Sequence, residues 1–160
     1  MAKPNRFRRY HYKVFLPENV SEMVLEFINQ LGDKEIGYTH HAIDEQNKDK
    51  RGKIPTATRE ELLDPSNTLV EFYEILSKAG RPTGKIQKLV VRLHNLDDKF
   101  DYTYVVAREG YTVSNWANSK TDEHRLDQTA DLYYCPPEKK ERRLIRILNN
   151  ARDYIKKDDL

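Results

Sequence analysis

The chain has 160 residues, of which 38% are hydrophobic and 34% are charged, which fits one domain with a compact core and a heavily solvated surface. Its formal net charge of +2 excludes a histone-like polycation, and its single cysteine excludes an internal disulfide and a cysteine-rich zinc site. No segment approaches the roughly 20 apolar residues of a membrane span and no apolar run follows the basic N-terminus, so we expect a cytoplasmic protein without membrane contact.

The first part of the sequence predicts one strand and two helices. Residues 10–16 have the composition of a strand, and the apolar residues of 19–31 recur at steps of three and four, which is typical of an amphipathic helix. Residues 38–50 predict a short, largely polar helix that Thr39 caps. Residues 51–67 contain prolines and a glycine, and we expect a connecting segment with one helical turn near its end.

The middle of the sequence predicts an antiparallel sheet. Residues 68–76 are rich in β-branched and aromatic side chains and favour a strand, although their length and charge also permit a helix. Residues 86–94 alternate between apolar and polar side chains. Residues 102–107 and 111–116 are two strands separated by a tight turn, so they run antiparallel.

The C-terminal part completes the prediction. A short strand is expected over 132–134, and 138–157 read as an amphipathic helix with arginine and lysine on its polar face. We therefore predict a single α+β domain over 1–160, with its core at about 38–134 and a basic N-terminal segment at 1–12. In it, N-terminal helices pack on one face of a sheet of about four or five antiparallel strands.

Three groups of residues are candidates for chemistry, and the first is the start of the short polar helix. His40 and His41 lie there, and Arg51 follows one loop later. The positive potential at a helix N-terminus favours the neutral, proton-accepting form of a histidine, as a general base requires. The alternative is a pair of surface or capping histidines without a chemical role.

The second group surrounds the only tryptophan. Thr112, Ser114 and Trp116 are spaced by two along a predicted strand, so we expect the two hydroxyl groups to share the face of the indole. A polar loop follows and contains Asn118, Lys120 and His124. Such a strand end can line a cleft, and the alternative is an ordinary polar turn with a packed tryptophan.

The third group is one face of the strand KIQKLVVRLH. Lys88 and Arg92 point away from its apolar row and could bind a scissile phosphate, because a guanidinium fork matches phosphate oxygens. The alternative is a solvated sheet face.

Together these groups provide the histidines, hydroxyls and cations that RNA cleavage without a metal or other cofactor requires. A histidine would take the proton of a ribose 2′-OH, a cation would stabilise the phosphorane, and a second acid would protonate the 5′-oxygen. The products would be a 2′,3′-cyclic phosphate and a free 5′-OH. The sequence contains no glycine-rich phosphate loop, no acidic cluster for two Mg²⁺ ions and no H-E-x-x-H zinc motif.

Five stretches resemble a known group of nucleases. HAIDEQNKDKRGKIPTATREEL is similar to the opening of small phage and toxin nucleases, and their sheet region is similar to VEFYEI, KLVVRLH, YTYVVAREGYTVSNWAN and DEHRLD. This resemblance, over about 38–134, is to phage-associated branches of the barnase, EndoU, colicin and RelE-like ribonuclease superfamily. Where that family has a second arginine, one turn after the helix histidine, this chain has Glu45 or Gln46.

The resemblance implies a helix packed on an antiparallel sheet, with RNA cleaved on the open sheet face. By position, His41 matches the helix histidine, Arg92 a basic strand residue, Thr112 or Ser114 the hydroxyl before the tryptophan, and His124 a later histidine. The expected partners are RNA and an antitoxin or immunity protein that restrains a toxin or host-takeover enzyme.

Two other functions stay open at this stage. A non-catalytic module from a phage or mobile element would hold nucleic acid or a protein on the same face, with Tyr102, Tyr104 and Tyr111 stacking on bases. A structural or virion-associated protein would have no role on RNA. Loss of function in His41→Ala would favour the enzyme, and steep salt dependence of binding would favour the module.

Overall fold

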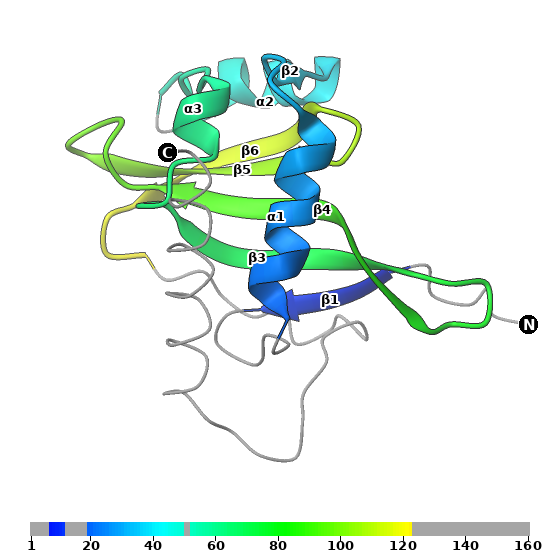
Figure 1. The fold of residues 1–160 in the computed structure, drawn as a ribbon. Helices are drawn as coiled ribbons and strands as arrows, with labels where there is room; N and C mark the ends of the chain where they lie inside the picture. The colour runs from blue at the N-terminus through cyan, green and yellow to red at the C-terminus, as the bar shows by residue number, and fades with distance from the viewer. Residues whose placement is uncertain (1–6, 12–18, 50–51, 123–160) are drawn as a thin grey trace, which may run out of the picture.

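The computed structural model describes residues 7–11, 19–49 and 52–122, which form an α+β fold with one mixed sheet (Figure 1). Its elements in chain order are β1 (Phe7–His11), α1 (Val20–Leu31), β2 (Gly37–Tyr38), α2 (His40–Lys48), α3 (Arg59–Leu62), β3 (Thr68–Leu76), β4 (Pro82–Leu93), β5 (Phe100–Ala107) and β6 (Tyr111–Ser119). No helix within the described ranges is long and apolar enough to cross a membrane.

The sheet has six strands in the order β1-β3-β4-β5-β6-β2. Along this order, each pair of neighbours from β1 to β6 is antiparallel, whereas β2 runs parallel to β6. The predicted purely antiparallel sheet of fewer strands was therefore wrong. β2 has only two residues, one of them glycine, and is too short for a period of two to be visible in the sequence.

Local signals predicted most of the other elements correctly. The first strand, predicted over 10–16, begins earlier, as β1 at Phe7, and residues 12–16 lie outside the described residues. Thr39 caps α2 by accepting a hydrogen bond from the backbone N–H of Ala42 at 3.2 Å. The open choice at 68–76 is settled as strand β3. The predicted strand at 132–134 and the helix at 138–157 lie outside the described residues.

One face of the sheet packs against α1, which crosses β3, β4 and β5 in Figure 1. The buried side of this helix carries Val20, Met23, Val24, Phe27 and Leu31. They share a hydrophobic core with residues that alternate along the central strands, namely Phe72, Leu89, Val91, Leu93, Tyr102, Tyr104 and Val106. Burial of this apolar row orients the sheet, so that the other residues of the same strands face the opposite side.

The opposite side, here called the second face, has its own smaller apolar cluster. Val70, Val90 and Val105 are buried there, and Tyr73, Val113 and Trp116 pack against them. Lys88 and Arg92 belong to the same side, because they alternate with the core residues of β4. This alternation positions the polar side chains of β4 and β5 that are discussed below.

Candidate functional site: a histidine and a buried carboxylate at one end of the sheet

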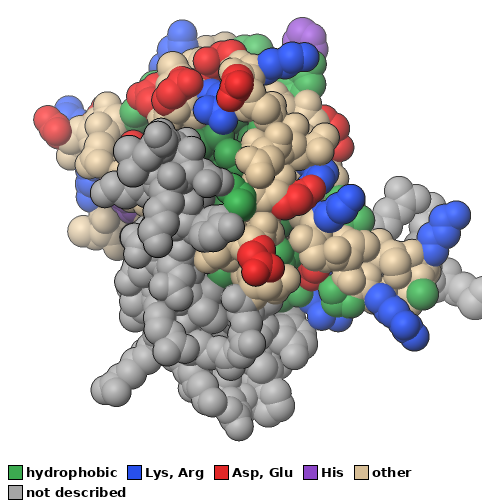
Figure 2. Space-filling view, viewed as in Figure 1, with side chains coloured by type: hydrophobic (Ala, Val, Ile, Leu, Met, Phe, Trp, Pro, Cys, Tyr) green, Lys and Arg blue, Asp and Glu red, His purple; other side chains and the backbone are tan. Residues whose placement is uncertain are grey.

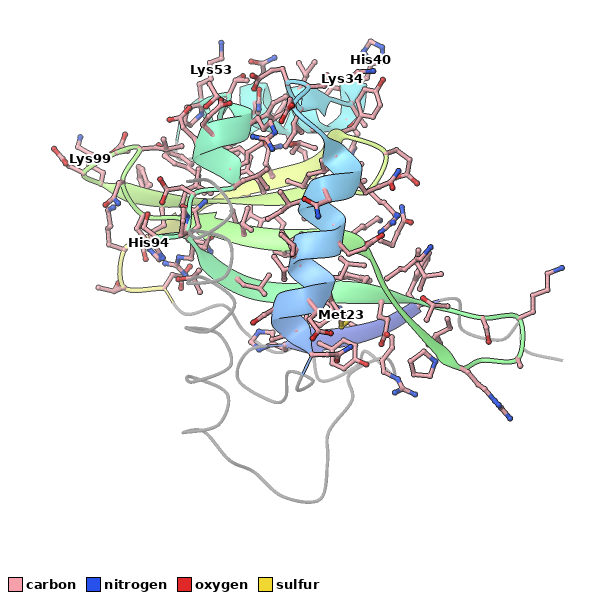
Figure 3. The ribbon with its side chains drawn as sticks, viewed as in Figure 1. Met23, Lys34, His40, Lys53, His94 and Lys99 are labelled. Carbon is pink, nitrogen blue, oxygen red and sulfur yellow. The ribbon has the colours of Figure 1, made fainter. Side chains whose placement is uncertain are left out.

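Charged and hydroxyl side chains gather where β4 ends and β5 begins. We call Thr68, Arg92, His94, Asp101 and Lys120 the sheet-end cluster. Figure 3 shows His94 at the end of the sheet away from the long β3–β4 hairpin. The strands bring these residues together although they come from four separate parts of the sequence.

Hairpin register explains why they meet. Arg92 pairs with Thr103 and Leu93 with Tyr102, so the next position of the same ladder places His94 beside Asp101. β3 runs antiparallel to β4 and brings Thr68 opposite Arg92. Because side chains alternate, the residues two apart on each strand share the second face.

Asp101 is the centre of the cluster. Its side chain is only 3% exposed, and its Oδ2 accepts hydrogen bonds from Arg92 Nε at 2.8 Å and from His94 Nδ1 at 2.9 Å. Lys120 Nζ lies 3.0 Å from the other oxygen, Oδ1. A buried carboxylate is costly unless it is paired and hydrogen-bonded. Asp101 forms ion pairs with Arg92 and Lys120, and its Oδ2 accepts hydrogen bonds from Arg92 and His94.

These contacts decide the charge of Asp101. Burial by itself would raise the pKa of this carboxyl, but hydrogen bonds from Lys120, Arg92 and His94 outweigh it, and the pKa is lowered below its ordinary value. Asp101 is therefore an anion at neutral pH. It can hold the imidazole of His94 in one orientation.

The imidazole of His94 is bonded at both nitrogens. Nδ1 faces Asp101 Oδ2 at 2.9 Å, and Nε2 lies 2.7 Å from Thr68 Oγ1. With the proton on Nδ1, which the carboxylate favours, Nε2 accepts the hydrogen bond of the hydroxyl. The His94 side chain is 38% exposed, so an oriented, proton-accepting imidazole is accessible to a ligand.

Arg92 lies in the cluster, but not as the exposed phosphate ligand that the strand pattern predicts. It is 6% exposed, and its guanidinium donates to Asp101, to the carbonyl oxygen of Ser119 at 3.0 Å and to that of Asp122. The alternation that put it opposite the apolar row is correct, but the second face is buried at this position. Arg92 holds Asp101 and the chain after β6 in place.

The predicted general base His41 and the predicted hydroxyl of Ser114 lie in a different place. α2 runs beside β6, where Glu45 Oε2 accepts a hydrogen bond from Ser114 Oγ at 3.2 Å and lies 3.6 Å from His41 Nε2. We call His41, Glu45 and Ser114 the edge group. The side chain of His41 is 73% exposed.

The predicted catalytic set is therefore divided between two sites. Ser114 and Asn118, on the same strand, are separated by about 13 Å at roughly 3.3 Å per residue, and Asn118 pairs with Asp101 of the sheet-end cluster. Lys88 and Arg92 are separated by a similar distance along β4. His41 and Ser114 thus do not converge with Arg92 as the sequence predicts.

Thr112 is the clearest correction. A register shift between Val105 and Val106 leaves Val113 as an extra residue in β6, so Thr112 pairs with Val106 and faces the core side, opposite to Ser114. Thr112 is completely buried. A β-bulge of this kind reverses the alternation that the sequence pattern assumes.

The remaining predicted ligands are spread over the second face and α2. Asn118 Oδ1 accepts a hydrogen bond from Thr103 at 2.8 Å, and Trp116 packs on the apolar cluster. Lys88 Nζ lies 5.9 Å from the centre of the Tyr73 ring. His40, labelled in Figure 3, is exposed at the start of α2.

Two predicted residues, Arg51 and His124, lie outside the described residues. Of the tyrosines expected to stack on bases, Tyr102 and Tyr104 are buried in the core, whereas Tyr111 is 52% exposed. No group of three or more metal-ligating acids, histidines or cysteines occurs in the described part of the chain.

Sequence reasoning missed Thr68, His94 and Asp101. The signal was available for two of them: if the turn between the two strands centres on residues 97 and 98, His94 and Asp101 are directly opposite each other across the hairpin. Thr68 depends on the β3–β4 register, which contains several irregularities that a pattern of alternation cannot locate.

Comparison with known proteins gives no relative on which to rest a function: neither the family models, nor the curated proteins, nor the solved structures match the chain. The side chains of the sheet-end cluster therefore provide the main argument. On the α1 side of the molecule, Figure 2 shows acidic and basic side chains interspersed, so that view offers no surface of a single sign for a phosphate backbone.

Proposed function

We propose that this chain is a metal-independent ribonuclease that cleaves RNA through attack of the ribose 2′-OH, with His94 as the proton-transferring residue. The observation that carries the proposal is the imidazole held between the Asp101 carboxylate and a hydroxyl group, beside the Lys120 ammonium. The products are a 2′,3′-cyclic phosphate and a free 5′-OH.

The proposed roles follow from the hydrogen bond that a substrate hydroxyl could replace. His94 Nε2 already contacts a hydroxyl at 2.7 Å, the distance at which a general base takes a proton, and a ribose 2′-OH would exchange with Thr68 at this nitrogen. Asp101 keeps the imidazole oriented and stabilises its protonated form, as the carboxylate does in a serine-type triad.

Lys120 supplies the second part of the chemistry. Its side chain is 37% exposed although its Nζ contacts Asp101, so the ammonium can face solvent and a bound phosphate. A cation at this position would stabilise the charge that develops on the phosphorane and can donate a proton to the leaving 5′-oxygen. Arg92 positions Asp101 and does not touch the phosphate in this proposal.

An enzyme that degrades RNA without a cofactor must be restrained in the cell that makes it. We therefore propose a toxin or phage host-takeover role with an antitoxin or immunity protein as partner. Such an inhibitor would cover the half-exposed side chains of His94 and Lys120. Co-expression with the inhibitor should then relieve toxicity as effectively as His94→Gln.

The test is RNA cleavage by the purified protein in EDTA, followed by analysis of the new ends. We expect cyclic phosphate and 5′-OH ends, and loss of about 100-fold or more in rate for His94→Gln. His41→Gln is the matched control, because its imidazole also faces a carboxylate but lies in the edge group. Equal loss in both variants, or no loss in either, would contradict the assignment to His94.

A non-catalytic nucleic-acid-binding module is the second candidate, and Tyr111 is the observation that favours it. Its ring is 52% exposed and lies against Gly37, where an added Cβ would come within 2.8 Å of the ring. An exposed aromatic face can stack on a base. In this case RNA would bind without being cut, affinity would fall with salt, and Tyr111→Ala would weaken binding where His94→Gln would not.

A further inference from the structure

Thr68 and its neighbours have the arrangement of a nucleophile, a base and an orienting acid. Thr68 Oγ1 lies 2.7 Å from His94 Nε2, and His94 Nδ1 lies 2.9 Å from Asp101 Oδ2. Activation of a hydroxyl needs this order: the base takes its proton and the carboxylate fixes the base. The edge group contains the same three kinds of side-chain group in a different order, because there the carboxylate lies between the imidazole and the hydroxyl.

Exposure within this set also fits a reaction centre. Asp101 is buried, His94 is 38% exposed, and Thr68 is partly exposed at the first position of β3. The orienting group is thus shielded while the two groups that would meet a substrate remain reachable.

We propose that Thr68 is a nucleophile that attacks ester carbonyl groups, so that the chain also has an acyl-transfer activity on small esters. This inference does not rest on the ribonuclease proposal, since it involves no RNA and uses the hydroxyl of the protein itself. Activation by an adjacent base is what a weak nucleophile such as threonine needs.

The proposed step is balanced without any cofactor. Thr68 Oγ1 forms a bond to the ester carbonyl carbon while its proton passes to His94 Nε2. The carbon–oxygen bond of the ester then breaks, and the same proton leaves with the alcohol. Water subsequently attacks the acyl-threonine with His94 as base, which releases the carboxylic acid and restores the hydroxyl.

Lys120 is placed to assist at the carbonyl oxygen. Its ammonium contacts Asp101 and the carbonyl oxygen of His94, so it lies beside the imidazole and is still 37% exposed. A cation next to the attacked carbonyl stabilises the oxyanion of the tetrahedral intermediate.

The experiment uses the full chain and p-nitrophenyl acetate as the probe. We measure release of p-nitrophenol and, after a short acid quench, the position of any acetyl group by peptide mass spectrometry. We expect acetyl on Thr68 and a rate above that of buffer. Thr68→Val should reduce the rate to background, Thr68→Ser should retain it within about tenfold, and His94→Gln should lower it by about 100-fold or more.

Thr83→Val is the control for loss of a hydroxyl, because Thr83 is exposed on β4 and, among the described residues, its hydroxyl bonds to nearby backbone and not to the cluster. Folding of each variant is checked by denaturant unfolding. An acetyl group on another residue, or a Thr68→Val protein as active as the parent, would overturn the inference. The ribonuclease proposal fails separately, when His94→Gln still cuts RNA.

Discussion

The sheet-end cluster and the edge group both pair a histidine with a carboxylate and a hydroxyl, but they differ in burial. At the sheet end, Asp101 is 3% exposed and lies 2.9 Å from the imidazole. At the edge, Glu45 is 30% exposed and lies 3.6 Å from a histidine that is itself 73% exposed. Water screens the second pair more strongly because both side chains are more exposed, whereas the first pair is shielded by burial and held by neighbouring cations. An imidazole beside a carboxylate is therefore held more firmly at the sheet end than at the edge.

The largest expected effect is at the buried carboxylate. Asp101→Asn removes the anion and leaves Arg92 and Lys120 as neighbouring cations without their shared partner. Loss of one partner from a buried ion pair costs about 3–5 kcal/mol, and we expect a fall of this size in the free energy of unfolding measured with urea. Glu45→Gln is the matched variant and should cost less than about 1 kcal/mol. Equal losses would remove the distinction between the two sites.

The same carboxylate predicts how stability depends on pH. Because the pKa of Asp101 is lowered in the folded chain, the folded state binds its proton less readily than the unfolded state does. Its contribution is fully present above the unfolded pKa of about 3.9 and is lost as the pH falls through the lower folded value. Urea unfolding between neutral pH and pH 3 should show this loss, and Asp101→Asn should show a shallower decline. Parallel curves for the two proteins would contradict the assignment.

A smaller effect is expected at the start of β6, where it pairs with β2. A Cβ at Gly37 would lie 2.8 Å from Tyr111 Cδ1, so Gly37→Ala must displace the ring. Overpacking typically costs 1–3 kcal/mol, and we expect about 1 kcal/mol because the ring is half exposed and can move. Combining Gly37→Ala with Tyr111→Ala should recover the loss caused by the clash. Calorimetry or urea unfolding measures both, and an undiminished loss in the double variant would show that the ring is not the cause.

The smallest effect is expected at His41. The side chain is largely exposed and its contact with Glu45 is long, so His41→Ala should change the free energy of unfolding by no more than about 0.5 kcal/mol. It should also leave RNA cleavage unchanged. A large loss of RNA cleavage in a folded His41→Ala protein would show that His41 on α2 is the general base.

The accuracy of sequence reasoning differed between local and long-range features. The structure confirms three features that depend on residues close together in the sequence: the Thr39 cap, the α1 periodicity and the alternation in β4. The parallel pair β2–β6 and the bulge at Val113 depend on contacts between distant segments, and the sequence pattern does not contain them.

The candidate site shows the same limit. The sequence correctly put Arg92 on the face opposite the core row, but it could not show that this face is buried there or that Asp101 accepts the guanidinium. The sequence predicted His41 as a general base because it lies near the N-terminus of a helix, which the sequence shows. His94 derives its interest from Asp101 and Thr68, which become its neighbours only through strand pairing.

Glu45 has a consequence for assembly. Its Oε1 accepts a hydrogen bond from the backbone N–H of Asn115 at 3.1 Å, and the Asn115 side chain donates to the carbonyl oxygen of Ala42 at 3.0 Å. A helix side chain thus occupies a position on β6 that an added strand would otherwise bond. This stretch of β6 is closed to an added strand, so a partner that extends the sheet at this point would first have to displace α2.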